Sequence, residues 1–185
     1  MKVKYLFVEL IAILLLILVV GCNKVQIANK GPLSIYDIYI PEKAVFIDSK
    51  QSKDFLYEAT IVVNAIKGND KYQSLQFRVK ITPKTGKTYT NVRATGFIDP
   101  SMKNIMPVNT YLVFGTQKLK GYTLNKNSRD QKGLIIGRTT WISRNMNIKY
   151  LINFLSKDIL IKLTWENHTE FVKIKPEDIT IKFEK

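Results

Sequence analysis

The sequence predicts an all-β protein in which two sheets pack face to face as a sandwich. Eight or nine short segments rich in β-branched and aromatic residues follow one another between residues 34 and 183. They recur at spacings of roughly ten to fifteen residues and show no strand–helix–strand rhythm. Only residues 147–158 have their apolar side chains at helical spacing. We therefore expect one sandwich domain over residues 34–185, with a small β-barrel as the alternative fold.

The first half of this domain contains four strand patterns, at residues 34–40, 55–66, 75–82 and 89–99, and a short further piece at residues 44–47. The clearest is "LQFRVKIT", residues 75–82, in which every second residue is apolar and the others are polar. This alternation is typical of an antiparallel strand with one buried and one wet face. A turn at residues 83–87 follows it, and we expect Gly86 to adopt positive φ there.

The second half continues the pattern, with strands predicted at residues 110–119, 134–142, 159–165, 171–174 and 178–183 and a loop at 124–133. A bend or bulge is expected at Gly115. In the helical segment, Ile148, Leu151, Ile152 and Leu155 fall on one face and predict two to three turns. The segment "ILIKLTWENHTEFVKIK" that follows is typical of a hairpin, with Asn167 and His168 at the turn.

The first 22 residues, "MKVKYLFVELIAILLLILVVGC", have the order of a secretory signal peptide. Lys2 and Lys4 precede an apolar run of residues 10–20, and a small residue follows it. Eleven residues form about 16 Å of helix, which is short of the ~30 Å hydrocarbon core of a bilayer. A longer segment would place Glu9 inside the membrane at a cost of a few kcal/mol. We therefore predict a cleaved signal peptide over residues 1–21 rather than an uncleaved membrane anchor.

The end of this segment, Val19-Val20-Gly21-Cys22, resembles the lipobox of bacterial lipoproteins. The resemblance implies that the Cys22 thiol carries a diacylglyceryl group and that the chain is cut between Gly21 and Cys22. It also implies that the mature chain is held at the extracytoplasmic face of the bacterial cell membrane. Two acyl chains give stable attachment where one would exchange. Residues 22–33 then form a lipidated tether, which is polar and contains Gly-Pro.

A second resemblance concerns the domain itself. The segment "TPKTGKTYTNVRATGF", residues 82–97, consists of a strand, a turn and a small polar entry to the next strand. It resembles the immunoglobulin-like domains of Gram-positive lipoproteins of unknown function, as does the helix followed by a carboxy-terminal hairpin. The resemblance extends over residues 55–183. It implies an immunoglobulin-like β-sandwich with one short helix near the carboxy terminus.

The chain is strongly basic, with a formal net charge of +14. Such a domain is attracted to polyanions such as teichoic acid, acidic lipid head groups or nucleic acid. The lysines are scattered and form no run of five like charges, which favours solubility and composition as the explanation. Export makes nucleic acid a poor partner. We expect the membrane, through Cys22, as the first partner, with anionic envelope polymers or an envelope protein as further candidates.

The sequence offers no catalytic, metal or cofactor site. Cys22 and His168 are the only cysteine and the only histidine, so no zinc site and no Cys–His or Ser–His pair can form. His168 is expected as a polar residue at a hairpin tip. Asp37 and Glu58 are the carboxylates that lie inside strand patterns, and we expect both on a wet face or an edge rather than in catalysis.

Trp141 and Trp165 each lie at a strand end. Either tryptophan is suited to stack against a sugar or a peptide, but packing in the core is favoured for both. The resulting hypothesis is a non-enzymatic binding or structural lipoprotein of the cell envelope. The alternatives are a small-ligand-binding lipoprotein and an exclusion or immunity lipoprotein that protects its own cell.

Overall fold

The computed structural model describes residues 40–41, 43–107, 112–116 and 119–184. The predicted signal peptide, Gly21, Cys22, the tether and Asp37 lie outside the described residues. So does the predicted strand at residues 34–40, apart from its last residue.

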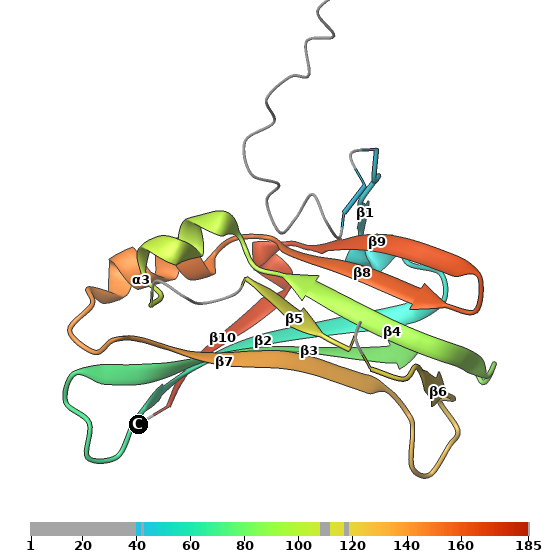
Figure 1. Ribbon diagram of the computed structural model, residues 1–185, viewed down its shortest axis with the longest axis horizontal. Helices are drawn as coiled ribbons and strands as arrows, with labels where there is room; N and C mark the ends of the chain where they lie inside the picture. The colour runs from blue at the N-terminus through green and yellow to red at the C-terminus, as the bar shows by residue number, and fades with distance from the viewer. Residues whose placement is uncertain (1–39, 42, 108–111, 117–118, 185) are drawn as a thin grey trace, which may run out of the picture. The chain divides into compact units, whose positions relative to one another are not determined.

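The described chain forms two β-sheets that face each other (Figure 1). The four-stranded sheet has the order β10 (Ile179–Glu184), β2 (Phe55–Ala65), β3 (Tyr72–Pro83) and β7 (Leu134–Ser143). The six-stranded sheet has the order β1 (Ile47–Asp48), β9 (His168–Ile174), β8 (Ile159–Trp165), β4 (Tyr89–Phe97) and β5 (Val113–Gly115), with β6 (Tyr122–Leu124) also paired to β4. Helix α3 (Ile148–Leu155) and the 3₁₀ helices η1 (Ser49–Gln51), η2 (Pro100–Asn104) and η3 (Pro176–Asp178) complete the structure.

The strand order is that of an immunoglobulin-like sandwich. Strands β2, β3 and β7 correspond to A, B and E, and strands β9, β8, β4 and β5 correspond to G, F, C and C′. From β2 to β9 the chain changes sheet between β3 and β4, between β6 and β7 and between β7 and β8, and α3 lies in the last of these connections. Strand β10 is an addition that pairs in parallel with β2. The two described sheets stay separate and do not close into a barrel, so the alternative fold is wrong.

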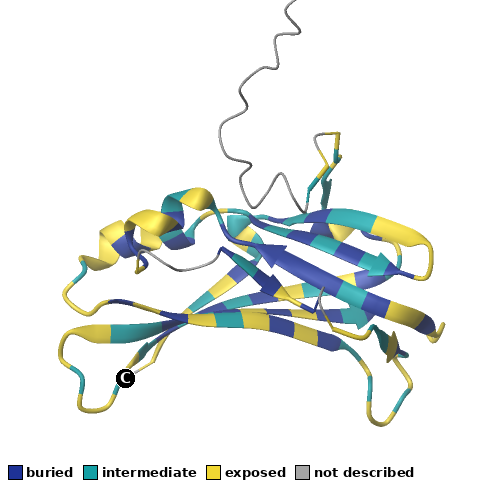
Figure 2. Ribbon diagram, in the orientation of Figure 1, coloured by how far each residue is buried: buried dark blue, intermediate teal, exposed yellow. Residues whose placement is uncertain are grey.

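The core fills the space between the sheets, where the inner faces are buried (Figure 2). Every second residue of β3, from Leu75 to Ile81, is at most 2% exposed, as the alternation predicted. The tryptophan of β8, Trp165, packs edge-on against Phe55 at 5.1 Å between ring centroids, and Tyr89 lies 4.6 Å from Phe55. The prediction that Trp165 is a core residue is therefore confirmed.

Helix α3 has the predicted length of just over two turns, but only part of its apolar face is buried. Its first turn is capped by the Asn147 side chain, which accepts hydrogen bonds from two backbone N–H groups. Leu151 and Leu155 pack into the core, but Ile148 and Ile152 are 55% and 40% exposed. The helix contacts the sandwich along a narrow stripe only.

Local details depart from the prediction in three places and agree with it at Gly115. The positive φ expected at Gly86 is found instead at Gly68, in the turn between β2 and β3. The bend at Gly115 is confirmed, because β5 ends there at a φ of +132°. His168 opens strand β9 opposite Trp165 rather than lying in the turn. The short elements β6 and η2 were not predicted, since three and five residues are too few to show a period.

Candidate functional site

The outer face of the four-stranded sheet carries the best-formed surface site among the described residues. Strand alternation places one set of side chains in the core and the opposite set on this face. A hollow of about 320 Å³ is lined there by Glu58, Thr60, Val62, Asn64, Gln76, Arg78, Lys80, Lys182 and Glu184. A second hollow of about 440 Å³ adjoins the first and shares Glu58 and Thr60 with it, and the two hollows together are called the trough.

Hydrogen-bonding register brings the lining residues together in rows across the strands. Lys182 of β10 lies opposite Val62 of β2, which lies opposite Gln76 of β3. The next row in one direction joins Thr60 and Arg78. These residues are far apart in sequence, and only the pairing of β10, β2 and β3 makes them neighbours.

The charges of the trough are mixed. Glu58 and Lys80 form an ion pair of 2.8 Å across β2 and β3, with side chains 63% and 50% exposed. An exposed pair of this kind contributes well under ~1 kcal/mol to stability, because solvent screens it. Within the described part of the chain, the side chains of Arg78, Lys182 and Glu184 make no ion pair and no hydrogen bond. Three polar groups with strong bonding capacity are therefore left open to a ligand.

Two exposed aromatic rings lie beside one end of the trough. Trp141 is 59% exposed and Tyr72 is 46% exposed. Tyr72 pairs with Ser143, and Ser74 pairs with Trp141, so the two rings are diagonal neighbours on the outer face. The prediction that Trp141 packs in the core is wrong. Its strand alternates as expected, but the inward positions are Thr140 and Ile142, and Trp141 falls on the opposite parity.

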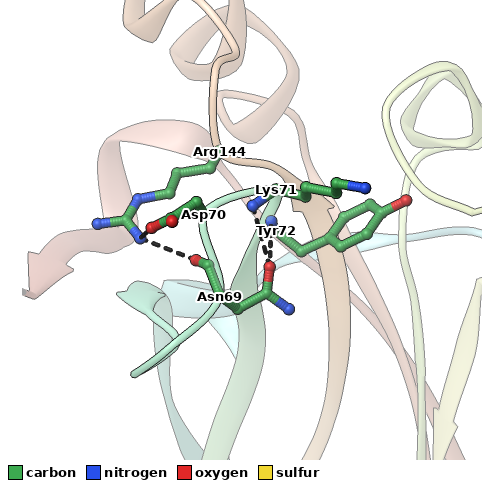
Figure 3. Close-up of polar contacts among 5 residues, drawn as sticks. All are labelled: Asn69, Asp70, Lys71, Tyr72 and Arg144. Atoms are coloured by element: carbon green, nitrogen blue, oxygen red, sulfur yellow. Dashed lines mark hydrogen bonds and ion pairs between the residues drawn. The ribbon is translucent and has the colours of Figure 1, made fainter.

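The turn between β2 and β3 fixes the start of the strand that carries Tyr72 (Figure 3). The Asn69 side-chain oxygen accepts hydrogen bonds from the backbone N–H groups of Lys71 (3.0 Å) and Tyr72 (2.9 Å). Arg144, just after β7, donates to the Asn69 carbonyl at 2.8 Å and lies 3.4 Å from a carboxylate oxygen of Asp70. These contacts tie the turn to the end of β7, while the Tyr72 ring projects away from them.

The other predicted site residues do not assemble into a reactive centre. His168 is exposed, and its ring stacks on Trp165 at 5.5 Å between centroids. Glu58 lies on the wet face, as predicted, and is paired with Lys80. No group of three or more potential metal ligands occurs among the described residues. Likewise, the helices in the described ranges are all too short or too polar to cross a membrane.

A half-buried carboxylate network was not predicted from the sequence. Glu170 of β9 accepts hydrogen bonds from the Tyr57 phenol (2.9 Å) and the Ser52 hydroxyl (3.1 Å). Burial, and then the Glu170 charge, raises the pKa of Tyr57 well above its usual value. The network joins the two sheets near their edge and is structural, because the phenol stays protonated at neutral pH.

Comparisons with known proteins identify no family for this chain. The sequence matches no model of a known protein family, and no curated protein matches it. Among solved structures, the ligand-binding region of serine-glutamate repeat protein A from Enterococcus faecium aligns with 68% of this chain and 96% of that one. The identity is 14% and the TM-score 0.29. A likeness of this degree assigns no function to the chain.

Proposed function

We propose that the chain is a membrane-anchored extracytoplasmic lipoprotein that acts as a non-enzymatic binding module of the cell envelope. The lipid on Cys22 would supply the anchor, and the outer face of the four-stranded sheet would supply the binding surface. The observation that carries the binding role is the pair of exposed rings, Trp141 and Tyr72, beside a trough in which Arg78, Lys182 and Glu184 are unpaired. Tryptophan, tyrosine and arginine are the residues that most often dominate binding energy.

The shape of the trough favours a binding module over capture of a small apolar ligand. Volumes of about 320 and 440 Å³ fall at the low end of small-ligand sites, which hold roughly 300–1,000 Å³. Such sites are, however, mostly apolar and enclose their ligand. This trough is lined by charged and polar groups on an open sheet face. No feature of the described residues favours the exclusion or immunity function.

The contacts of the carboxylates Glu58 and Glu170 support a non-enzymatic function. Glu58 is exposed and paired with Lys80, and Glu170 is engaged by Tyr57 and Ser52. Both carboxylates are therefore already engaged by partners within the protein. The fixed strands that carry the trough also suit recognition, because they hold its side chains in place before a ligand arrives.

The anchor is tested by labelling lipids in cells that express the full chain. Wild-type protein should incorporate labelled acyl chains and be cut by a protease added to intact spheroplasts or protoplasts. Cys22→Ala should remain an unprocessed, unlabelled precursor. Equal labelling of both proteins would refute the lipid attachment.

The binding surface is tested with full chains purified in detergent and incubated with washed envelope from cells lacking the protein. Trp141→Ala should reduce retention on the envelope. Tyr150→Ala is the matched control, since Tyr150 is 52% exposed on helix α3, away from the trough. Equal retention of wild type and both variants would show that the outer sheet face is not the binding surface.

A further inference from the structure

The trough is elongated along strand β2. Its outward-facing lining on β2 extends from Leu56 to Asn64, and at the Leu56 end residues of η1 and η3 also line it. Eight residues at ~3.4 Å per residue span about 27 Å. A trough of this length and open form is complementary to a chain-like ligand that continues beyond both ends, and not to a compact one.

The aromatic pair provides a flat apolar surface at one end. A single cross-strand row runs from Trp141 through Ser74 and Asn64 to Glu184, so the rings lead directly into the trough. Trp141 lies two strands from β2, which is about 10 Å at ~4.8 Å per strand. An exposed ring of this kind offers apolar contact area to one face of a ligand ring while its edge stays hydrated.

The polar groups between the ends are suited to hydroxyl and carboxylate groups together. The amides of Asn64 and Gln76 and the Glu184 carboxylate offer donors and acceptors for hydroxyl groups. The side-chain oxygen of Asn64 is buried and accepts no hydrogen bond within the described residues. A buried acceptor without a donor is costly, and a sugar hydroxyl that reached this oxygen would supply the missing donor.

Two cations of the trough are free to bind an anionic group. Arg78 and Lys182 lie in adjacent rows and have no charged partner in the described chain. Arginine forms two parallel hydrogen bonds to a carboxylate, which gives both strength and orientation. Gly137, opposite Arg78 on β7, has no side chain to cover the arginine from that direction.

From these features we infer that the trough binds a linear acidic polysaccharide whose sugar rings carry carboxylates. One ring stacks on Trp141 and Tyr72, hydroxyls bond to the amides and to Glu184, and carboxylates bond to Arg78 and Lys182. This inference rests on the proposed function, because it names the ligand class for the same sheet face. An anionic lipid surface fits less well, since a planar surface cannot enter a trough that runs along one strand.

The test uses the full chain in detergent and polymers that separate ring contact from charge. Polygalacturonate, alginate and hyaluronate present sugar rings with carboxylates, methyl-esterified galacturonan presents rings without charge, and polyglutamate presents charge without rings. At least one of the three acidic polysaccharides should bind and shift the emission of Trp141 to shorter wavelength. The chain should bind that polysaccharide more tightly than polyglutamate. If the polysaccharide is polygalacturonate, methyl esterification should lower the affinity.

Variants then assign the binding to the trough. Trp141→Ala and Arg78→Gln should each weaken binding of the acidic polysaccharide by roughly tenfold, the loss expected for a residue that contributes ~1.4 kcal/mol. The matched controls are Tyr150→Ala and Lys149→Gln, an exposed ring and an exposed cation on helix α3. Both controls should bind like wild type.

Two results would overturn the inference. The first is that polyglutamate binds as tightly as the acidic polysaccharides and that Trp141→Ala does not weaken this binding. The net positive charge of the chain would then explain the binding. The other is no binding of the three acidic polysaccharides. If Trp141→Ala still lowers retention on washed envelope in that case, the sheet face remains the binding surface and only the ligand class is wrong.

Discussion

Substitution of Gly96 by alanine tests the packing of the six-stranded sheet. Gly96 of β4 lies opposite Phe114 of β5, and the phenylalanine ring covers it. A Cβ atom at Gly96 would lie 2.2 Å from Cζ of that ring and 2.5 and 2.7 Å from its two Cε atoms. Phe114 is only 5% exposed, so the ring has little free space into which to move.

The magnitude follows from two opposing effects. Gly96 does not have positive φ, so alanine is compatible with the backbone and would stabilise by ~0.4–1 kcal/mol through the unfolded state. Forcing a methyl group into a packed core costs about 1–3 kcal/mol. Contact with three ring carbons places the cost in the upper part of that range. We expect a net destabilisation of about 1–2 kcal/mol, which lowers Tm by roughly 2–8 °C for a domain of this size.

The assay is thermal and denaturant unfolding followed by near-ultraviolet circular dichroism, in a cycle with Phe114→Leu. Leucine lacks the ring atoms that Gly96→Ala would contact, so the cost of the alanine should fall below about 0.5 kcal/mol in that background. A neutral or stabilising Gly96→Ala, or a cost that Phe114→Leu leaves unchanged, would refute the reasoning.

Three further predictions follow from single contacts. The raised pKa of Tyr57 means that folding favours the protonated phenol. The free energy of unfolding should therefore fall as the pH rises above about 10, the pKa of tyrosine in the unfolded chain. Tyr57→Phe should make the urea midpoint less dependent on pH between about 9 and 11.5. Asn147→Ala should cost about 1 kcal/mol, measured by urea unfolding, because it removes the cap of α3; Asn147→Ser should restore most of it. A double-mutant cycle of Glu58→Gln and Lys80→Gln should give a coupling free energy of less than about 1 kcal/mol that disappears in high salt. A larger coupling would contradict the exposure of the two side chains.

The strands were predictable where apolar and polar residues alternate strictly. Strand β3 shows the reason, because between Leu75 and Thr82 its inward residues are all large and apolar and its outward ones all polar, so side-chain parity alone identifies both the strand and its faces. Strand β6 has three residues and depends on pairing with β4, which no local pattern records. Helix α3 was located from its spacing, but the exposure of Ile148 and Ile152 depends on how narrow its contact with the sandwich is.

The candidate site was only partly predictable for a related reason. Glu58 was placed correctly on a wet face, since the alternation of its strand assigns it there. Trp141 was misplaced, because the strand ends in "TTWIS", where both parities contain an apolar residue and the pattern no longer distinguishes inside from outside. The trough itself joins residues of β10 to residues of β2 and β3 that lie more than a hundred positions earlier in the chain. Their register is set by tertiary pairing and is absent from any local stretch of sequence.

Trp141 allows stability and binding to be separated within one strand. Its neighbours Thr140 and Ile142 face the core, whereas the indole is 59% exposed on the outer face. Substitutions at exposed positions usually change stability by no more than ~0.5 kcal/mol, while truncating a buried isoleucine costs about 2–5 kcal/mol. Trp141→Ala should therefore unfold at nearly the wild-type denaturant midpoint, and Ile142→Ala should unfold much earlier. If Trp141→Ala instead costs more than 1 kcal/mol, the indole packs against the protein itself, and the outer face is not an open surface for a ligand.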